Sequence, residues 1–94
     1  MYSADLLKGR VALITGGGSG IGLSIAEQYL ALGAKVAIVS RNAERLESAA
    51  SSLRSQGTTE IAAFQADVRN YNQVSAAVDA VLERFGSLDI LVNN

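Results

Sequence analysis

Short apolar runs alternate with stretches whose apolar residues recur at helical spacing, and this alternation constrains the fold more than any other feature of the chain. The continuous apolar runs are Val11–Ile14, Val36–Val39 and Ile61–Phe64, and Leu88–Val92 is a fourth run with one interruption. Continuous runs of this length are typical of strands that are buried on both faces. Successive strand–helix–strand crossovers place such strands side by side in a parallel sheet with helices on both faces. The sequence therefore predicts an α/β fold with a doubly wound parallel sheet.

The stretches between these runs carry the start and stop signals of helices. The first covers residues 21–32 and has apolar residues at intervals of four. Asn42 and Asn70 each occupy the position of a good N-cap, and Gln73 completes a capping-box spacing with Asn70. Glycine follows each stretch where its helix would end, at Gly33, Gly57 and Gly86. The fourth apolar run is interrupted by Asp89, which we expect to be a strand residue at the sheet surface rather than a catalytic acid.

Composition and charge exclude several functional classes. Eight Lys and Arg residues against nine Asp and Glu residues leave a net charge of −1, which gives no footprint for nucleic acid and no polybasic patch for a membrane surface. The absence of Cys and His removes a thiolate nucleophile, a Cys-type zinc site and the commonest general base, so no metal site is expected. No apolar run is long enough for a secretory signal or a membrane span, which makes a cytoplasmic location the default expectation. A C-terminal targeting signal beyond Asn94 is not visible in this sequence.

A glycine-rich turn, residues 15–22, joins the first strand to the first helix and carries the chemistry of the chain. It reads Thr-Gly-Gly-Gly-Ser-Gly-Ile-Gly. Such a turn lets the backbone approach a pyrophosphate, and the helix that follows offers free N–H groups and the positive end of its dipole. Ser19 can add a hydroxyl donor, and Gly22 would let the helix pack tightly on the strand. The plainer interpretation is a loop that needs only glycine flexibility, but its place in a strand–helix–strand unit favours nucleotide binding.

The same turn resembles the Thr-Gly-x-x-x-Gly-Ile-Gly signature of the short-chain dehydrogenase/reductase family. Asp67 and Val68, after the third strand, resemble the family's adenine-contacting pair, and Leu91–Asn94 resembles the start of its Asn-Asn-Ala-Gly motif. The resemblance covers residues 7–94 and implies a Rossmann-type doubly wound sheet with the strand order 3-2-1-4. It also implies that the chain binds a nicotinamide dinucleotide. The turn residues expected to contact this cofactor are Gly16, Ser19, Gly20, Ile21 and Gly22.

Two residue pairs outside the turn complete the site that the resemblance implies. Asp67 would accept a hydrogen bond from the adenine amino group, and Val68 would add a backbone donor and an apolar wall. Of Asn93 and Asn94, one would support the sheet near Thr15 and the other would lie along the cofactor. The plainer interpretations are a turn residue before the next helix for Asp67, and an ordinary strand-end pair for the two asparagines.

The end of the second strand decides between the two nicotinamide cofactors. An acidic residue there would bind the ribose hydroxyls of NAD, whereas an arginine accommodates the 2′-phosphate of NADP. This chain has Ser40 and Arg41 there and no acid until Glu44. A planar, permanently charged guanidinium suits a phosphate, and a cation is otherwise disfavoured near a helix start. NADP(H) is therefore favoured over NAD(H), although Arg41 could instead be a solvated residue, and residues 17–19 lack the basic residue that many family members use for NADP.

The family's catalytic groups are absent from this chain. The resemblance implies hydride transfer by a Ser and a Tyr-x-x-x-Lys pair beyond the fourth strand, yet none of the three tyrosines is followed four residues later by lysine. No catalytic residue is therefore assigned. Residues 1–94 are expected to be the N-terminal half of a single NAD(P)-binding Rossmann domain, incomplete relative to the full family domain. The unpaired fourth strand would make the isolated chain prone to associate.

Two functional hypotheses from different classes remain open. The first is the cofactor-binding portion of an NADP(H)-dependent oxidoreductase that transfers a hydride to or from a carbonyl, alcohol or enoyl substrate, with a slight preference for acyl thioesters. The whole protein would then be a homo-oligomer. The second is a non-catalytic nucleotide-binding or interaction module that is complete at 94 residues.

Overall fold

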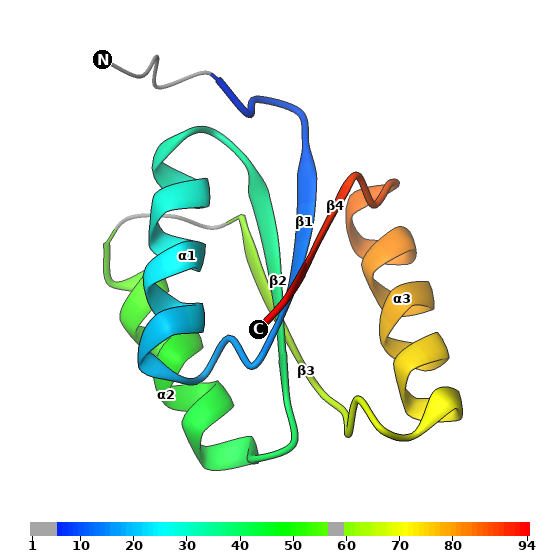
Figure 1. Cartoon of the computed structure of the whole chain (residues 1–94). Coiled ribbons are helices and arrows are strands. Elements are labelled where there is room, and N and C mark those ends of the chain that lie inside the picture. The colour runs from blue at the N-terminus through cyan, green and yellow to red at the C-terminus, as the bar shows by residue number, and fades with distance from the viewer. Residues whose placement is uncertain (1–5, 57–59) are drawn as a thin grey trace.

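The computed structural model of the chain describes residues 6–56 and 60–94. Its elements, in chain order, are β1 (Val11–Thr15), α1 (Gly20–Ala31), β2 (Lys35–Ser40), α2 (Ala43–Arg54), β3 (Ile61–Gln65), α3 (Tyr71–Phe85) and β4 (Ile90–Asn93). The strands pair in parallel in the order β3-β2-β1-β4 (Figure 1). The predicted α/β fold, a Rossmann-type doubly wound parallel sheet with the order 3-2-1-4, is confirmed.

Helices cover both faces of the sheet, and the core lies in two layers. α1 and α2 pack on one face, and α3 packs on the other (Figure 1). Along β2, Val36 and Ile38 belong to the layer under α1 and α2, whereas Ala37 and Val39 belong to the layer under α3. All four side chains are at most 2% exposed. Burial on both faces is the reason that this strand reads as a continuous apolar run rather than an alternating one.

The asparagine caps form as predicted, but the capping box does not. Asn42 Oδ1 accepts a hydrogen bond from Arg45 N at 3.0 Å, and Asn70 Oδ1 accepts one from Gln73 N at 3.1 Å. In a capping box the Gln73 side chain would return to Asn70 N. Instead, Gln73 Oε1 accepts from Asp67 N at 2.8 Å, because Asn70 N already donates to Asp67 O at 2.9 Å. Gln73 thereby ties the start of α3 to the segment that follows β3.

α1 and α3 end at glycines in the left-handed conformation. Gly33 follows the C-cap of α1 with a φ of 94°, and Gly86 caps α3 with a φ of 85°. Residues with a side chain rarely adopt this conformation, so glycine stops both helices as predicted. α2 ends at Arg54, and Gly57, the predicted stop of that helix, lies outside the described residues.

The fourth strand is shorter than predicted, because Asp89 binds β1 before β4 begins. Asp89 N donates to Val11 O at 2.9 Å, and Asp89 Oδ2 accepts from Val11 N at 2.9 Å. The carboxylate thus closes the start of the β1–β4 pairing. β4 begins at Ile90, so the prediction that Leu88 and Asp89 are strand residues is wrong. β4 forms one edge of the described sheet, and its residue Leu91 is 64% exposed. Association of the isolated chain through this strand stays a prediction.

Candidate functional site

The candidate site lies where the carboxyl ends of β1, β2 and β4 meet the loop before α1. Thr15, at the end of β1, is in register with Val39 of β2 and Asn93 of β4. The loop leaves β1 at Gly16 and reaches α1 close to the end of the chain at Asn94 (Figure 1). Open parallel sheets bind ligands just beyond the carboxyl ends of their strands, beside the point where the strand order reverses.

Hydrogen bonds hold the glycine loop in one shape. Gly16 N donates to Val39 O at 2.8 Å, and Ser19 N donates to Gly16 O at 3.0 Å. Ser19 is also the N-cap of α1, because its Oγ accepts from Gly22 N at 3.3 Å and donates to Gly16 O at 2.8 Å. The hydroxyl hydrogen that the sequence makes available for a phosphate is therefore engaged within the loop. A phosphate would receive it only after the hydroxyl turned away from Gly16 O.

Two glycines of this segment leave no room for a side chain. A Cβ at Gly22 would overlap the carbonyl oxygen of Gly16 and lie 2.9 Å from Gly17 Cα. A Cβ at Gly17 would lie 2.6 Å from Ile38 Cβ in β2, whereas a Cβ at Gly20 would meet nothing within 4 Å. Gly22 thus permits close packing of α1 on the loop's own backbone, where the sequence predicted packing on the strand.

Thr15 and the two terminal asparagines tie β4 to the glycine loop. Thr15 Oγ1 donates to Asn93 Oδ1 at 3.2 Å and accepts from Asn94 N at 3.1 Å. Asn94 Nδ2 donates to Ser19 Oγ at 3.1 Å and to Gly16 O at 3.4 Å. The side chain of Asn93 therefore supports the sheet at Thr15, and that of Asn94 fixes the loop.

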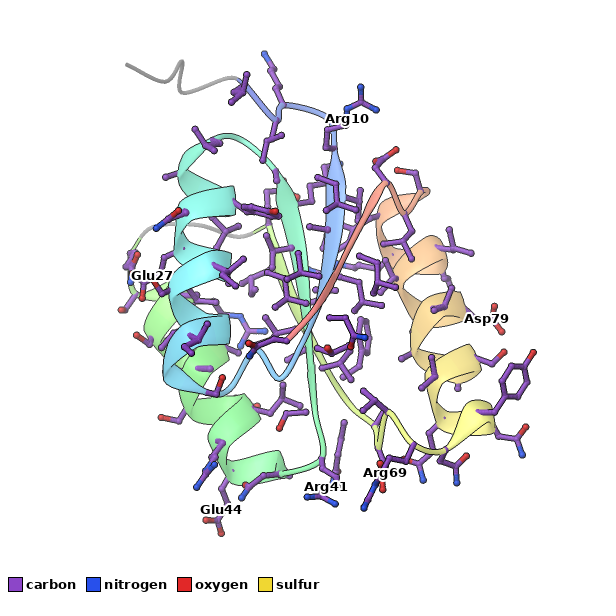
Figure 2. All side chains as sticks on the ribbon, viewed as in Figure 1. Arg10, Glu27, Arg41, Glu44, Arg69 and Asp79 are labelled. Atoms are coloured by element: carbon purple, nitrogen blue, oxygen red, sulfur yellow. The ribbon has the colours of Figure 1, made fainter. Side chains whose placement is uncertain are left out.

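A cavity of about 330 Å³ opens at the carboxyl ends of β1, β2 and β3. Its lining includes Ser40 and Arg41 from the end of β2, together with Asp67 and Val68 from the segment after β3. Figure 2 shows Arg41 and Arg69 at this end of the molecule, and Arg69 lines the same cavity. The structure therefore brings together the residues that the sequence places at the ends of these two strands.

Arg69 holds the carboxylate of Asp67 in a bidentate pair at the wall of this cavity. Arg69 Nε donates to Asp67 Oδ1 at 3.1 Å, and Arg69 Nη2 donates to Asp67 Oδ2 at 3.0 Å. The backbone N of Arg69 adds a hydrogen bond to Asp67 Oδ1 at 2.9 Å. These bonds favour the ionised carboxylate and lower the pKa of Asp67 from 3.8 to about 2. Asp67 is therefore an ionised hydrogen-bond acceptor at neutral pH.

We expect the carboxyl group of Asp67 to titrate with a midpoint near pH 2. A depressed carboxyl pKa stabilises the fold fully above the ordinary carboxyl pKa, and the stabilisation is lost as the pH falls through about 2. Arg69→Gln should raise the midpoint toward 3.8. Arg54→Gln is the control, because Arg54 lies in the last turn of α2 and is not among the groups that shift this pKa, so it should leave the midpoint unchanged. NMR titration of the carboxyl carbon measures these midpoints. A wild-type midpoint near 3.8 would contradict the role given to Arg69.

Arg45, which the sequence analysis did not assign to the site, also lies in this region. A second cavity, of about 510 Å³, lies beside Ser40 and Arg41, and its lining includes Gly18 of the loop and Arg45 of α2. Its spacing in the sequence could have indicated this position. Arg45 lies in the first turn of the helix that Asn42 caps, four residues after Arg41. That spacing brings both arginines to the end of β2.

Comparison with known families decides the class of this chain. The family model described as short chain dehydrogenase matches residues 10–94. The chain belongs to the short chain dehydrogenase family. Its parallel sheet is accordingly the nucleotide-binding Rossmann fold of a family of oxidoreductases.

Peroxisomal 2,4-dienoyl-CoA reductases are among the short chain dehydrogenases that this chain resembles. The protein from Danio rerio is 47% identical over 94 residues, which make up 100% of this chain and 31% of the relative. The protein from Arabidopsis thaliana is 46% identical over 92 residues, which make up 98% of this chain and 30% of the relative. This chain thus spans about a third of the length of these curated relatives.

Solved structures of short chain dehydrogenases share this arrangement of strands and helices. The 3-ketoacyl-(acyl-carrier-protein) reductase from Brucella melitensis, complexed with NADH, is 42% identical to this chain with a TM-score of 0.83. The match covers 90% of this chain and 33% of the reductase chain. Actinorhodin polyketide ketoreductase with NADPH is 40% identical to this chain with a TM-score of 0.87. The match covers 100% of this chain and 34% of the ketoreductase chain. The structural neighbours therefore include complexes of both nicotinamide cofactors.

Proposed function

We propose that residues 1–94 form the N-terminal half of an NAD(P)-binding Rossmann domain in an NADP(H)-dependent oxidoreductase. Arg41 carries this proposal, because it lines both cavities that adjoin the glycine loop. No acidic residue occurs from Lys35 to Asn42, so the end of β2 offers no carboxylate to the ribose hydroxyls of NAD. A guanidinium in this place suits the 2′-phosphate of NADP.

The rest of the site would hold the remaining parts of the cofactor. The pyrophosphate would lie on the loop and the first turn of α1, at Gly16, Ser19, Gly20, Ile21 and Gly22. The open space beside Gly20, where an added Cβ meets nothing within 4 Å, supports a close approach of phosphate to the backbone. Asp67 would accept from the adenine amino group with Val68 beside the ring. Of the two asparagines, Asn94 would lie along the cofactor, and Asn93 would support the sheet at Thr15. The two cavities, of about 330 and 510 Å³, have the size of ligand sites.

A carbonyl, alcohol or enoyl compound is the proposed substrate, with acyl thioesters favoured. The nicotinamide supplies or accepts the hydride when the cofactor is bound, and the residues of this chain bind and orient that cofactor. Groups that move the proton would come from outside residues 1–94. The preference for acyl thioesters is supported by relatives that are named for acyl groups on coenzyme A or on acyl carrier protein.

The alternative is a non-catalytic module complete at 94 residues. The coding sequence of the gene distinguishes it from the enzyme proposal. Reading the gene past the codon of Asn94 should show Ala-Gly, then a Ser and a Tyr-x-x-x-Lys motif. A stop codon at that point would defeat the enzyme proposal for this product. With the motif present, the whole protein should oxidise NADPH faster than NADH when it is supplied with 2,4-dienoyl or 3-ketoacyl thioesters.

Two further proposals concern cellular location and assembly. Within residues 6–56 and 60–94, none of the helices combines the length and the hydropathy that crossing a membrane requires. We propose a cytoplasmic location and a homo-oligomeric whole protein. Relatives named as peroxisomal make the peroxisome the competing location, which imaging of the tagged natural protein distinguishes.

A further inference from the structure

The carboxylate of Asp67 keeps one acceptor position after its contacts within the described residues are counted. Oδ1 accepts from Arg69 N at 2.9 Å and from Arg69 Nε at 3.1 Å. In the described part of the chain, Oδ2 accepts only from Arg69 Nη2, at 3.0 Å. Because a carboxylate offers about four acceptor positions, two on each oxygen, Arg69 leaves one of them on Oδ2.

The backbone on either side of this carboxylate is fixed. Asp67 N donates to Gln73 Oε1 at 2.8 Å, and Asp67 O accepts from Asn70 N at 2.9 Å. Ala66, the preceding residue, is 2% exposed, and its N donates to Ser40 O at 3.1 Å. Rotation of the side chain is therefore the main freedom left to Asp67, and the two parallel bonds from the Arg69 guanidinium restrict it.

Asp67 is the one acidic residue that lines the cavity at the carboxyl ends of β1, β2 and β3. Val68 and Arg69 line the same cavity. An ionised carboxylate accepts hydrogen bonds and donates none. A ligand group that reaches Oδ2 must therefore bring a hydrogen-bond donor, and a carbonyl oxygen in the same place would be repelled.

Nucleotide bases differ in the group that they would present to Oδ2. Adenine has an amino group, which donates, at the ring position where hypoxanthine has a carbonyl oxygen, which only accepts. A site that is built around one hydrogen bond rejects an analogue that lacks the matching group. Such rejection requires the acceptor to stay in one orientation, and Arg69 is the residue that fixes the orientation of Asp67.

We propose that Arg69 is a positioning residue, which orients Asp67 so that Oδ2 selects an adenine base through its amino group. The inference rests on the proposed function and deepens it, because it assigns the choice of base to a pair of residues. The plainer interpretation is an ion pair that only stabilises the turn. The Arg69 side chain is 73% exposed, and exposed ion pairs contribute little to folding, so the two interpretations predict different effects of its replacement.

Dissociation constants for NADPH and for its analogue with hypoxanthine in place of adenine, measured by calorimetry, test this role. The natural protein should bind NADPH about tenfold more tightly than the analogue, the effect of one hydrogen bond to a charged group. Arg69→Gln should reduce this preference to about threefold or less. Arg69→Lys should retain more of it, because lysine keeps the charge but not the planar fork. Arg54→Gln, in the last turn of α2, should leave the preference unchanged.

Asp67→Ala separates an effect through Asp67 from a direct contact of Arg69 with the base. This change should abolish the preference for adenine, and adding Arg69→Gln to it should alter the preference no further. In Arg69→Gln alone the carboxylate stays ionised at neutral pH, because the ordinary pKa of Asp67 is 3.8. A preference lost in that variant therefore reports the orientation of the carboxylate rather than its charge.

The outcomes separate this inference from the function on which it rests. A reduced preference in Arg69→Gln, with no further change on top of Asp67→Ala, supports both. An unchanged preference in Arg69→Gln, or a further change in the double variant, overturns the role of Arg69 and leaves the NADP(H) function standing. A natural protein that prefers NADPH to NADH but does not distinguish adenine from hypoxanthine overturns the inference alone. A natural protein that does not bind NADPH overturns both. Circular dichroism establishes that the variants are folded, and Arg69→Lys takes the place of Arg69→Gln if the latter unfolds.

Discussion

Replacing Gly22 with alanine is expected to lower the free energy of unfolding by about 3 kcal/mol and to abolish cofactor binding. The added Cβ would overlap the carbonyl oxygen of Gly16 and lie 2.9 Å from Gly17 Cα. Because both neighbours are backbone, the loop can yield only by moving as a unit. That movement would break the bonds by which Ser19 and Asn94 hold Gly16 O. Denaturant unfolding and NADPH titration measure the two losses.

Gly20→Ala is the matched control for this prediction. A Cβ at Gly20 meets nothing within 4 Å, and alanine is favoured over glycine in a helix by up to about 1 kcal/mol. Gly20→Ala should therefore keep or slightly raise the stability, while its methyl group occupies space that we assign to the pyrophosphate and weakens NADPH binding. Equal stability of the Gly22→Ala and Gly20→Ala proteins would contradict the packing of α1 on the loop.

Arg41→Asp should weaken NADPH binding about 100-fold or more, because it removes hydrogen bonds to a charged group and adds a like charge. NADH binding should be kept or improved, since a carboxylate at the end of β2 accepts the ribose hydroxyls of NAD. Arg54→Asp makes the same change of charge at the far end of α2 and should leave both affinities nearly unchanged. Calorimetric titration at one fixed ionic strength compares them. Equal losses for NADPH and NADH in Arg41→Asp would remove the assignment of Arg41 to the 2′-phosphate.

The fold could be predicted from the sequence wherever its determinants are local. Burial of Val36–Val39 under helices on both faces requires a continuous apolar run, and that run is visible in the sequence. Asn42 and Asn70 cap their helices through bonds to residues three positions later, and Gly86 ends α3 through its own backbone conformation. Each of these features depends on only a few neighbouring residues, so the element order and a parallel sheet follow from them, whereas the strand order 3-2-1-4 was implied by the family resemblance.

The contacts that shape the site depend on which segments meet, and single-sequence patterns do not encode them. Asp89 bonds Val11 across 78 positions of the chain, which shortens β4. Gln73 bonds Asp67 because the competing donor is already satisfied, and Arg45 lines the cavity beside the glycine loop. The positions of candidate residues could thus be predicted, whereas the hydrogen-bond partners and the second arginine required the packed structure.

The proposal that this chain binds NADP(H) is tested most directly by measuring the dissociation constants of NADPH and NADH side by side for the natural protein. Arg41 at the junction of the two cavities, with no carboxylate at the end of β2, predicts that NADPH binds at least about tenfold more tightly. Equal affinities, or tighter binding of NADH, would contradict it.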